Sequence, residues 1–188
     1  LTVFNLAHLC AQMGDRVIIV DADLHRPTQH KMAKTSHEKG LANVLAGEMT
    51  LDDAILDTGV PNLSFMPSGR MASGTHGLLD TTRVNELVKI LKERYDRVFF
   101  DAPPIIGVSD ASLLVREMEG VLLVIQHRKY PRALSSRAKF MIENVGGNLL
   151  GVVLNKLNIA RDYSYYGYGY YSYRYYYGKS DQKPKAKA

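Results

Sequence analysis

Residues 17–23 read Val-Ile-Ile-Val-Asp-Ala-Asp, four consecutive β-branched residues followed closely by two carboxylates, Asp21 and Asp23. An apolar run without polar alternation is typical of a strand buried on both faces of a parallel sheet. In open parallel sheets, ligands bind outside the carboxyl ends of the strands. We therefore expect Asp21 and Asp23 to lie at a sheet edge where chemistry can take place.

A second segment repeats this arrangement, because Val-Phe-Phe at residues 98–100 is followed by Asp101 and then by Ala-Pro-Pro. One aspartate after one strand is more often a helix N-cap or a turn residue. Two strands that end in this way favour a shared site, and residues two apart in an extended chain, such as Asp21 and Asp23, point to the same side. Mg²⁺ prefers oxygen ligands, so the pattern predicts a magnesium site.

The other apolar runs and the helical patterns between them predict the fold class. Strand-like runs recur at residues 63–66, 97–100, 121–125 and 149–154. Helical patterns cover residues 2–13, 84–95, 110–117 and 132–144. Gly14 follows the first helix, where a helix end favours glycine. This alternation predicts right-handed βαβ units, and hence an α/β fold with a mostly parallel sheet and helices on both faces.

The composition narrows the class of function. A single cysteine, Cys10, excludes a disulfide framework and most zinc or iron–sulfur sites. The net charge of +5 comes from scattered basic residues and a Lys-rich end, so we expect no nucleic-acid partner. His25, His30 and His37 fall in a polar segment without metal-ligand spacing, and we expect them to be solvated.

Three motifs carry a resemblance to a known family. The segment VDADLHRP at residues 20–27 resembles the primed Walker motif of the bacterial tyrosine kinases of exopolysaccharide and capsule synthesis, and VFFDAPP at residues 98–104 resembles their Walker B motif. The segment LLGVVLNK at residues 149–156, which leads into a tyrosine cluster, is similar to the end of that domain. The resemblance spans about residues 1–177 and implies a P-loop NTPase-like fold, shared with the MinD and ParA ATPases.

The resemblance implies a role for each matched residue. Asp21 would belong to the Mg²⁺ site, and Asp23 would be the base that accepts the proton of the tyrosine hydroxyl. Asp101 would be the Walker B carboxylate beside the metal. Asn155, after the last strand, would lie near the adenine, so that ATP and Mg²⁺ would be the cofactors.

The chain departs from the family pattern in three places. His25 stands where the primed motif usually has arginine, although Arg26 follows, and residues 75–79 read Thr-His-Gly-Leu-Leu where the family has Ser-Glu-Leu-Leu. No G-x-x-x-x-G-K-[ST] loop, which would wrap the phosphates, occurs in the sequence. We expect the first strand and this Walker A loop to precede Leu1, and residues 1–188 alone to bind ATP poorly and to transfer no phosphate.

The domain is expected to cover residues 1–160 and a flexible tail residues 161–188. Glycine and serine between the tyrosines favour an accessible segment. The candidate phosphoacceptors are Tyr163, Tyr165, Tyr166, Tyr168, Tyr170, Tyr171, Tyr173, Tyr175, Tyr176 and Tyr177. An adhesive low-complexity segment and a stacking platform for single-stranded nucleic acid are the alternatives. Each phosphotyrosine adds about −1.5 to −2 charges, so a few would reverse the charge of the chain.

The resemblance also implies partners and a location. They are a ring of identical subunits held by tail docking, a membrane polysaccharide copolymerase or activator segment, a cognate tyrosine phosphatase, and the cytoplasmic face of the bacterial inner membrane. The function predicted is a kinase that phosphorylates its own tyrosine tail and so regulates polysaccharide polymerisation and export. Two other functions stay open: a MinD- or ParA-like ATPase, and a non-catalytic regulator of a polysaccharide copolymerase.

Overall fold

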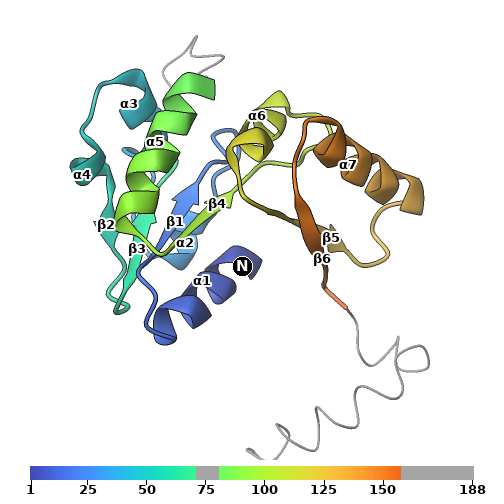
Figure 1. Ribbon diagram of the computed structural model, residues 1–188. Helices are drawn as coiled ribbons and strands as arrows, with labels where there is room; N and C mark the ends of the chain where they lie inside the picture. The colour runs from blue at the N-terminus through green and yellow to red at the C-terminus, as the bar shows by residue number, and fades with distance from the viewer. Residues whose placement is uncertain (71–80, 158–188) are drawn as a thin grey trace, which may run out of the picture.

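Strands and helices alternate along most of the chain, as the sequence predicts. The computed structural model describes residues 1–70 and 81–157 (Figure 1). The strands are β1 (Val17–Asp21), β2 (Leu56–Asp57), β3 (Leu63–Met66), β4 (Arg97–Asp101), β5 (Val121–Gln126) and β6 (Leu149–Asn155). The helices are α1 (Thr2–Gln12), α2 (Gln29–Met32), α3 (Leu41–Ala46), α4 (Leu51–Ala54), α5 (Thr81–Arg94), α6 (Ser109–Glu117) and α7 (Arg132–Asn144).

The described strands form two sheets. The larger has the order β2-β3-β1-β4, in which β1 runs parallel to both β3 and β4 and only the short β2 is antiparallel. The smaller pairs β5 with β6 in parallel. The mostly parallel architecture is therefore confirmed, whereas the strands are divided between two sheets. Within the described residues, β4 and β5 each pair along one edge only.

Strand β1 is the centre of the core, because all five of its residues are buried. Val17 and Ile19 face α1, where they pack with Ala7 and Ala11. Ile18 and Val20 face the opposite side, where α3, α5 and α6 supply apolar residues. The helices thus cover both faces of the larger sheet, as predicted.

The predicted boundaries differ from the structure by a few residues at most. Helix α1 ends at Gln12, and Gly14 adopts a positive φ of 100° just beyond it, as expected for a residue at a helix end. Strand β2 and helices α2, α3 and α4 are not predicted from the sequence. These elements have two to six residues, which is too short for a hydrophobic period to develop.

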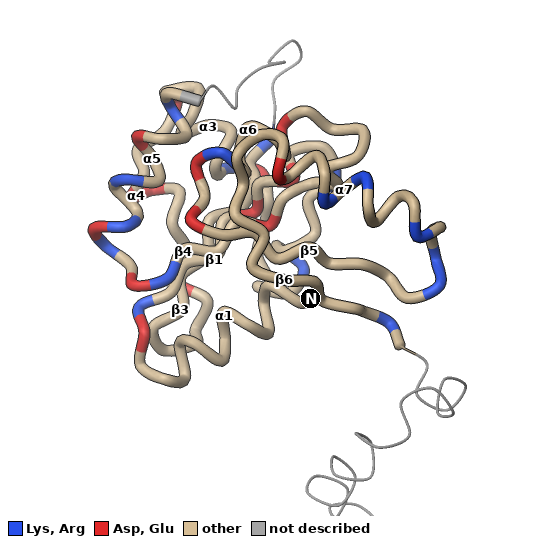
Figure 2. The backbone as a smooth tube through the Cα atoms, turned by 45° about the vertical axis from the view of Figure 1, so that its right-hand side comes forward, with Lys and Arg blue, Asp and Glu red and all other residues tan. Residues whose placement is uncertain are grey.

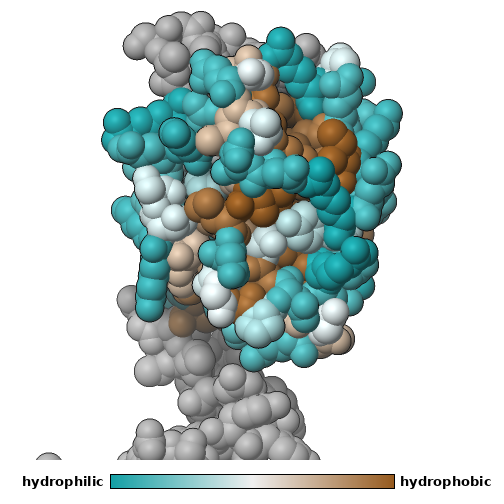
Figure 3. Space-filling model, turned by 90° about the vertical axis from the view of Figure 1, so that its left-hand side faces the viewer, coloured by the Kyte–Doolittle hydropathy of each residue, from teal (hydrophilic) through white to brown (hydrophobic). Residues whose placement is uncertain are grey.

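The smaller sheet is only partly covered by helices. Exposed and half-buried residues alternate along β6, and Leu150 and Val152 are 65% and 54% exposed. Helix α7 packs against β6. Apolar surface is also visible on the side of the molecule that carries α3, α4 and α5 (Figure 3).

Among the described helices, none combines the length and the apolar character that crossing a bilayer requires.

Candidate active site

The ends of β1 and β4 bring the predicted carboxylates together. Asp21 and Asp101 are register partners on these neighbouring parallel strands, and Asp23 follows two residues after Asp21. Asp21 is fully buried, while Asp101 and Asp23 are half-buried. Figure 2 shows acidic positions gathered between the labels of β1 and α6. Asp21 and Asp101 thus lie side by side at one edge of the sheet, and Asp23 follows in the adjoining loop.

Backbone groups of the following loop hold Asp21 in place. Its Oδ1 accepts a hydrogen bond from the N–H of Asp23 at 3.3 Å, and its Oδ2 accepts from the N–H groups of Thr28 and Gln29 at 3.2 and 3.0 Å. Burial raises the pKa of Asp21 to about 6, with a contribution from the charge of Asp101, although the backbone donors oppose this shift. The loop therefore folds around a carboxylate whose charge is costly to bury.

Asp101 is held by a side chain. The Nε2 of Gln29 donates a hydrogen bond to Asp101 Oδ2 at 2.6 Å. Burial raises the pKa of Asp101, although the hydrogen bond from Gln29 opposes this shift, and Leu1 lies close enough to Asp101 for a charge there to act on it. Since Leu1 precedes the first turn of α1, the positive end of this helix lies near the carboxylates.

Asp23 uses one carboxylate oxygen to stabilise a turn, while its other oxygen can take part in a reaction. Its Oδ1 accepts hydrogen bonds from the N–H groups of His25 and Arg26, at 3.2 and 2.9 Å, so it stabilises a turn as the structural alternative predicted. No hydrogen bond to Oδ2 of Asp23 comes from the described part of the chain. This oxygen can accept a proton from a hydroxyl group placed beside it.

The expectation that the three loop histidines are solvated holds for His25, which is exposed, but is wrong for His30 and His37. His25 Nε2 lies 3.1 Å from Asp110 Oδ2, which connects the loop to the first turn of α6. His30 and His37 are half-buried and stack, with ring centroids 4.4 Å apart. The reason is the short helix α2, which contains His30 and folds this polar segment back on itself.

Gln29 was not found by sequence reasoning. It is only 3% exposed, and it contacts both Asp21, through its backbone N–H, and Asp101, through its side chain. A glutamine in a polar stretch carries no periodic signal, so its burial depends on tertiary structure. Its neighbour Thr28 is exposed, which shows how local this burial is.

Asn155 is not brought into contact with the carboxylates. It ends β6 in the smaller sheet, where its Oδ1 accepts from the N–H of Lys156 and its carbonyl from the N–H of His127. The ten candidate tyrosines and residues 75–79 lie outside the described residues.

The carboxylate edge fits a magnesium ion. Burial raises the pKa values of two neighbouring carboxylates, Asp21 and Asp101, and the buried Oε1 of Gln29 has no hydrogen-bond partner among the described residues. In the described ranges, no group of three or more His, Cys, Asp or Glu residues forms a complete metal cage. Mg²⁺ commonly binds through one or two carboxylates and keeps several waters, so the donors present match its preference.

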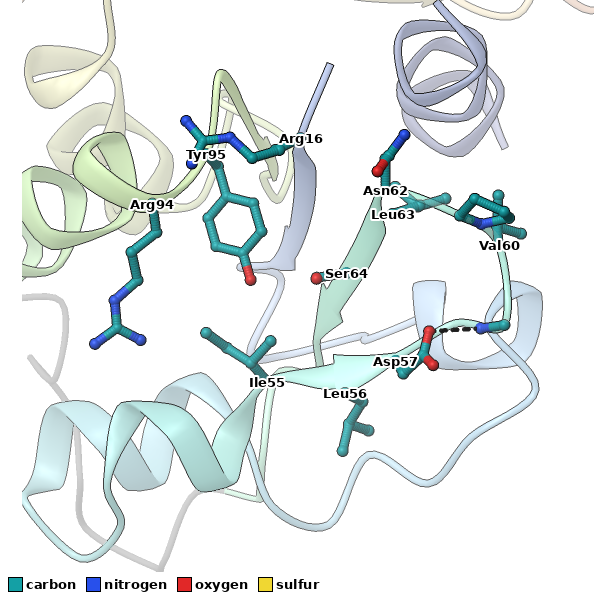
Figure 4. A pocket seen from close by; sticks show the side chains of 12 residues that line it. Arg16, Ile55, Leu56, Asp57, Val60, Asn62, Leu63, Ser64, Arg94 and Tyr95 are labelled. Carbon is teal, nitrogen blue, oxygen red and sulfur yellow. Dashed lines mark hydrogen bonds between the residues drawn. The ribbon is translucent and has the colours of Figure 1, made fainter. Parts of the chain in front are cut away.

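A surface hollow of about 600 Å³ lies elsewhere, and Figure 4 shows its lining. It adjoins Arg16 and Leu63, at the amino ends of β1 and β3, and therefore opens at the opposite end of the strands from the carboxylates. The Arg16 side chain in its wall pairs with Asp96 at 2.8 Å, and that of Arg94 pairs with Asp52. With both cations neutralised, the hollow offers no charge to an anionic ligand.

The known proteins that resemble this chain in sequence point to one family. Residues 1–144 match the model of an AAA domain. The tyrosine-protein kinase CpsD of Streptococcus agalactiae is 35% identical over 98% of this chain and 78% of its own length. The tyrosine-protein kinase YwqD of Bacillus subtilis is 33% identical over 88% of this chain and 71% of its own length.

Solved structures show the same relationship. The kinase domain of the Escherichia coli tyrosine kinase ETK superposes with a TM-score of 0.78 at 30% identity, over 82% of this chain and 61% of that one. MinD of Pyrococcus horikoshii, solved with Mg-ADP, gives 0.67 at 26% identity, over 83% of this chain and 64% of that one. Nearly the whole length of this chain aligns with one tyrosine kinase, and the chain shares its fold with the kinase domain of another. This chain therefore belongs to the bacterial tyrosine-protein kinase family, among the P-loop proteins that include MinD.

Proposed function

We propose that this chain is the main part of a protein-tyrosine kinase domain, which transfers the γ-phosphate of ATP to tyrosines, including those of its own tail. The observation that carries the proposal is the pairing of Asp21 with Asp101 at the carboxyl ends of adjacent parallel strands, with Asp23 two residues further on. This arrangement supports phosphoryl transfer, in which a base and the counter-charges of the phosphates must lie close together.

Each carboxylate has a separate part in the proposed reaction. Asp21 and Asp101 would hold Mg²⁺, directly or through water, and the ion supplies charge neutralisation for the phosphates when bound. Asp23 would accept the proton of the attacking tyrosine hydroxyl through its available Oδ2. Helix α1 directs its positive end towards this edge, where it favours an anionic phosphate. Asn155 would contact the adenine.

The phosphate-binding loop is proposed to come from residues that precede Leu1. The free edges of β4 and β5 leave room in the strand order for the strand that would carry it. Without this loop, residues 1–188 should bind ATP weakly, because the backbone donors and the lysine that neutralise a triphosphate are missing.

The tyrosine tail is proposed as the substrate and as the switch of assembly. Several added phosphates would reverse the net charge of +5 and oppose the docking of neutral tails into neighbouring subunits. A ring of subunits, a membrane copolymerase or activator segment at the cytoplasmic face of the inner membrane, and a tyrosine phosphatase would complete the system and regulate the export of a polysaccharide.

A direct test uses the gene product with the residues encoded before Leu1, ATP and Mg²⁺, and intact-mass spectrometry. We expect several additions of phosphate on tyrosine, and an Asp23→Asn variant should lose at least about a hundredfold in rate, at the lower end of general-base contributions. Glu93→Gln is the matched control, because this exposed carboxylate lies on α5 shortly before β4 begins, at the end of the strand away from Asp101.

The rival functions give different results in the same assay. A MinD-like ATPase, favoured by the fold similarity to MinD, would release phosphate from ATP without modifying any tyrosine. A non-catalytic regulator would do neither. Either result would overturn the kinase proposal.

A further inference from the structure

One buried side chain links the two carboxylates of the cation site. Gln29 donates from its backbone to Asp21 Oδ2 at 3.0 Å and from its side chain to Asp101 Oδ2 at 2.6 Å. It is the first residue of α2, so its position follows from the loop that also carries Asp23. A single residue therefore bridges two acidic groups that the pairing of their strands brings side by side.

The other half of the same amide is unused. Gln29 is 3% exposed, and its Oε1 is buried without a hydrogen-bond partner in residues 1–70 and 81–157. A buried carbonyl oxygen left unpaired costs about 1 to 3 kcal/mol, so a side chain with no function here would favour an apolar replacement. The unpaired oxygen belongs to the amide whose nitrogen binds Asp101, and it therefore lies within a few ångströms of that carboxylate.

We propose that Gln29 is a positioning residue of the cation site: its Nε2 holds Asp101 next to Asp21, and its Oε1 accepts a hydrogen bond from a water bound to the cation. This inference rests on the proposed function only in assuming a divalent ion at this edge. Magnesium keeps several of its waters, and each water donates hydrogen bonds to acceptors around the site. An amide suits this task because it provides one donor and one acceptor without charge.

Glutamine differs in a testable way from its two nearest replacements. Methionine has a similar length and fills the same volume, but it has neither a strong donor nor a strong acceptor. Glutamate keeps the acceptor oxygen and replaces the donor by a negative charge beside two others. The two variants therefore separate the task of holding Asp101 from the task of receiving a water.

The test titrates the purified chain with Mn²⁺ alone, followed by electron paramagnetic resonance, and measures the melting temperature with and without Mn²⁺. Gln29→Met should raise the Kd for Mn²⁺ by about tenfold, the lower end of the effect of outer-shell partners. Gln29→Glu should bind Mn²⁺ at least as tightly as the parent chain. Its metal-free form should melt several degrees lower and recover when Mn²⁺ is saturating.

Gln12→Met is the matched control, since Gln12 is exposed at the end of α1; it should change neither quantity. A purely structural role for Gln29 predicts lower melting temperatures in both variants with unchanged Kd, and this result would overturn the inference. The variants Asp21→Asn and Asp101→Asn test whether Mn²⁺ binds at these two carboxylates. If they leave Mn²⁺ binding intact, the ion lies elsewhere and the inference fails with the proposed cation site, whatever the phosphotransfer assay shows.

Discussion

At the scale of single residues, one carboxylate serves both local structure and the proposed chemistry. Asp21 accepts three backbone hydrogen bonds while it lies fully buried beside Asp101. Burying two neighbouring carboxylates opposes folding, because each loses hydration and each repels the other. The chain without a cation therefore carries an electrostatic cost that a bound divalent ion would relieve.

This cost predicts how the stability of the metal-free chain depends on pH. Burial raises the pKa of Asp21 to about 6, whereas an unfolded aspartate titrates near about 3.9. Between these values the folded chain holds a proton that the unfolded chain has released. The free energy of unfolding should therefore fall as the pH rises from about 4 to about 7, by about 1 to 3 kcal/mol from Asp21. Urea unfolding in EDTA across this range measures it.

An Asp21→Asn variant should lose this part of the pH dependence, since asparagine does not titrate. Glu93→Gln, the exposed control on α5, should keep it. An unchanged slope in Asp21→Asn would show that another group causes the effect and that the Asp21 carboxyl is not perturbed by its surroundings.

At the scale of elements, the loop between β1 and α2 is attached to α6 by one hydrogen-bonded pair of side chains, His25 and Asp110. His25 contacts Asp110 in the first turn of α6, while the backbone N–H of His25 donates to Asp23. The proposed base is thus connected through a turn to a helix more than 80 residues away. Such a partly exposed pair contributes little energy, but it restricts where the turn can lie.

Removing this pair should loosen the turn around Asp23. We expect His25→Ala to speed amide hydrogen exchange in residues 22–28 by about 1.5- to 5-fold, which corresponds to the 0.2 to 1 kcal/mol of an exposed pair. His25→Arg should keep exchange near that of the parent, because arginine can pair with Asp110. Asp52→Ala breaks the exposed pair with Arg94 and should leave these residues unchanged. Equal exchange in all four chains would contradict the role of His25.

The same scale shows what could be predicted from sequence. The apolar run from Val17 to Val20 correctly predicts a buried strand, because a strand buried on both faces has a continuous series of β-branched residues in its sequence. The meeting of Asp21 with Asp101 followed from topology, since parallel strands end at one edge. Gln29 and the contact of His25 with Asp110 could not be predicted, because both depend on how a short polar loop packs against distant elements.

At the scale of the whole molecule, the two sheets differ in how completely they are covered. Helices pack on both faces of the larger sheet, whereas each strand of the smaller sheet leaves apolar side chains exposed. These are Leu122 and Val124 on β5 and, on the opposite face, Val152 on β6. A sheet of two strands is only marginally stable without packing on a face. The packing of α7 against β6 therefore contributes to the stability of this pair of strands.

Two neighbouring valines on β6 test which side of this strand is covered, because side chains alternate between the two faces of a strand. Val152 is 54% exposed and Val153 is partly buried. Replacing either by threonine keeps the shape and adds one hydroxyl. Val152→Thr should change the free energy of unfolding by less than about 0.5 kcal/mol, whereas Val153→Thr should lower it by about 1 kcal/mol or more, because its hydroxyl loses hydration. Urea unfolding measures both, and an equal loss in both variants would mean that another surface covers the side of β6 that bears Val152.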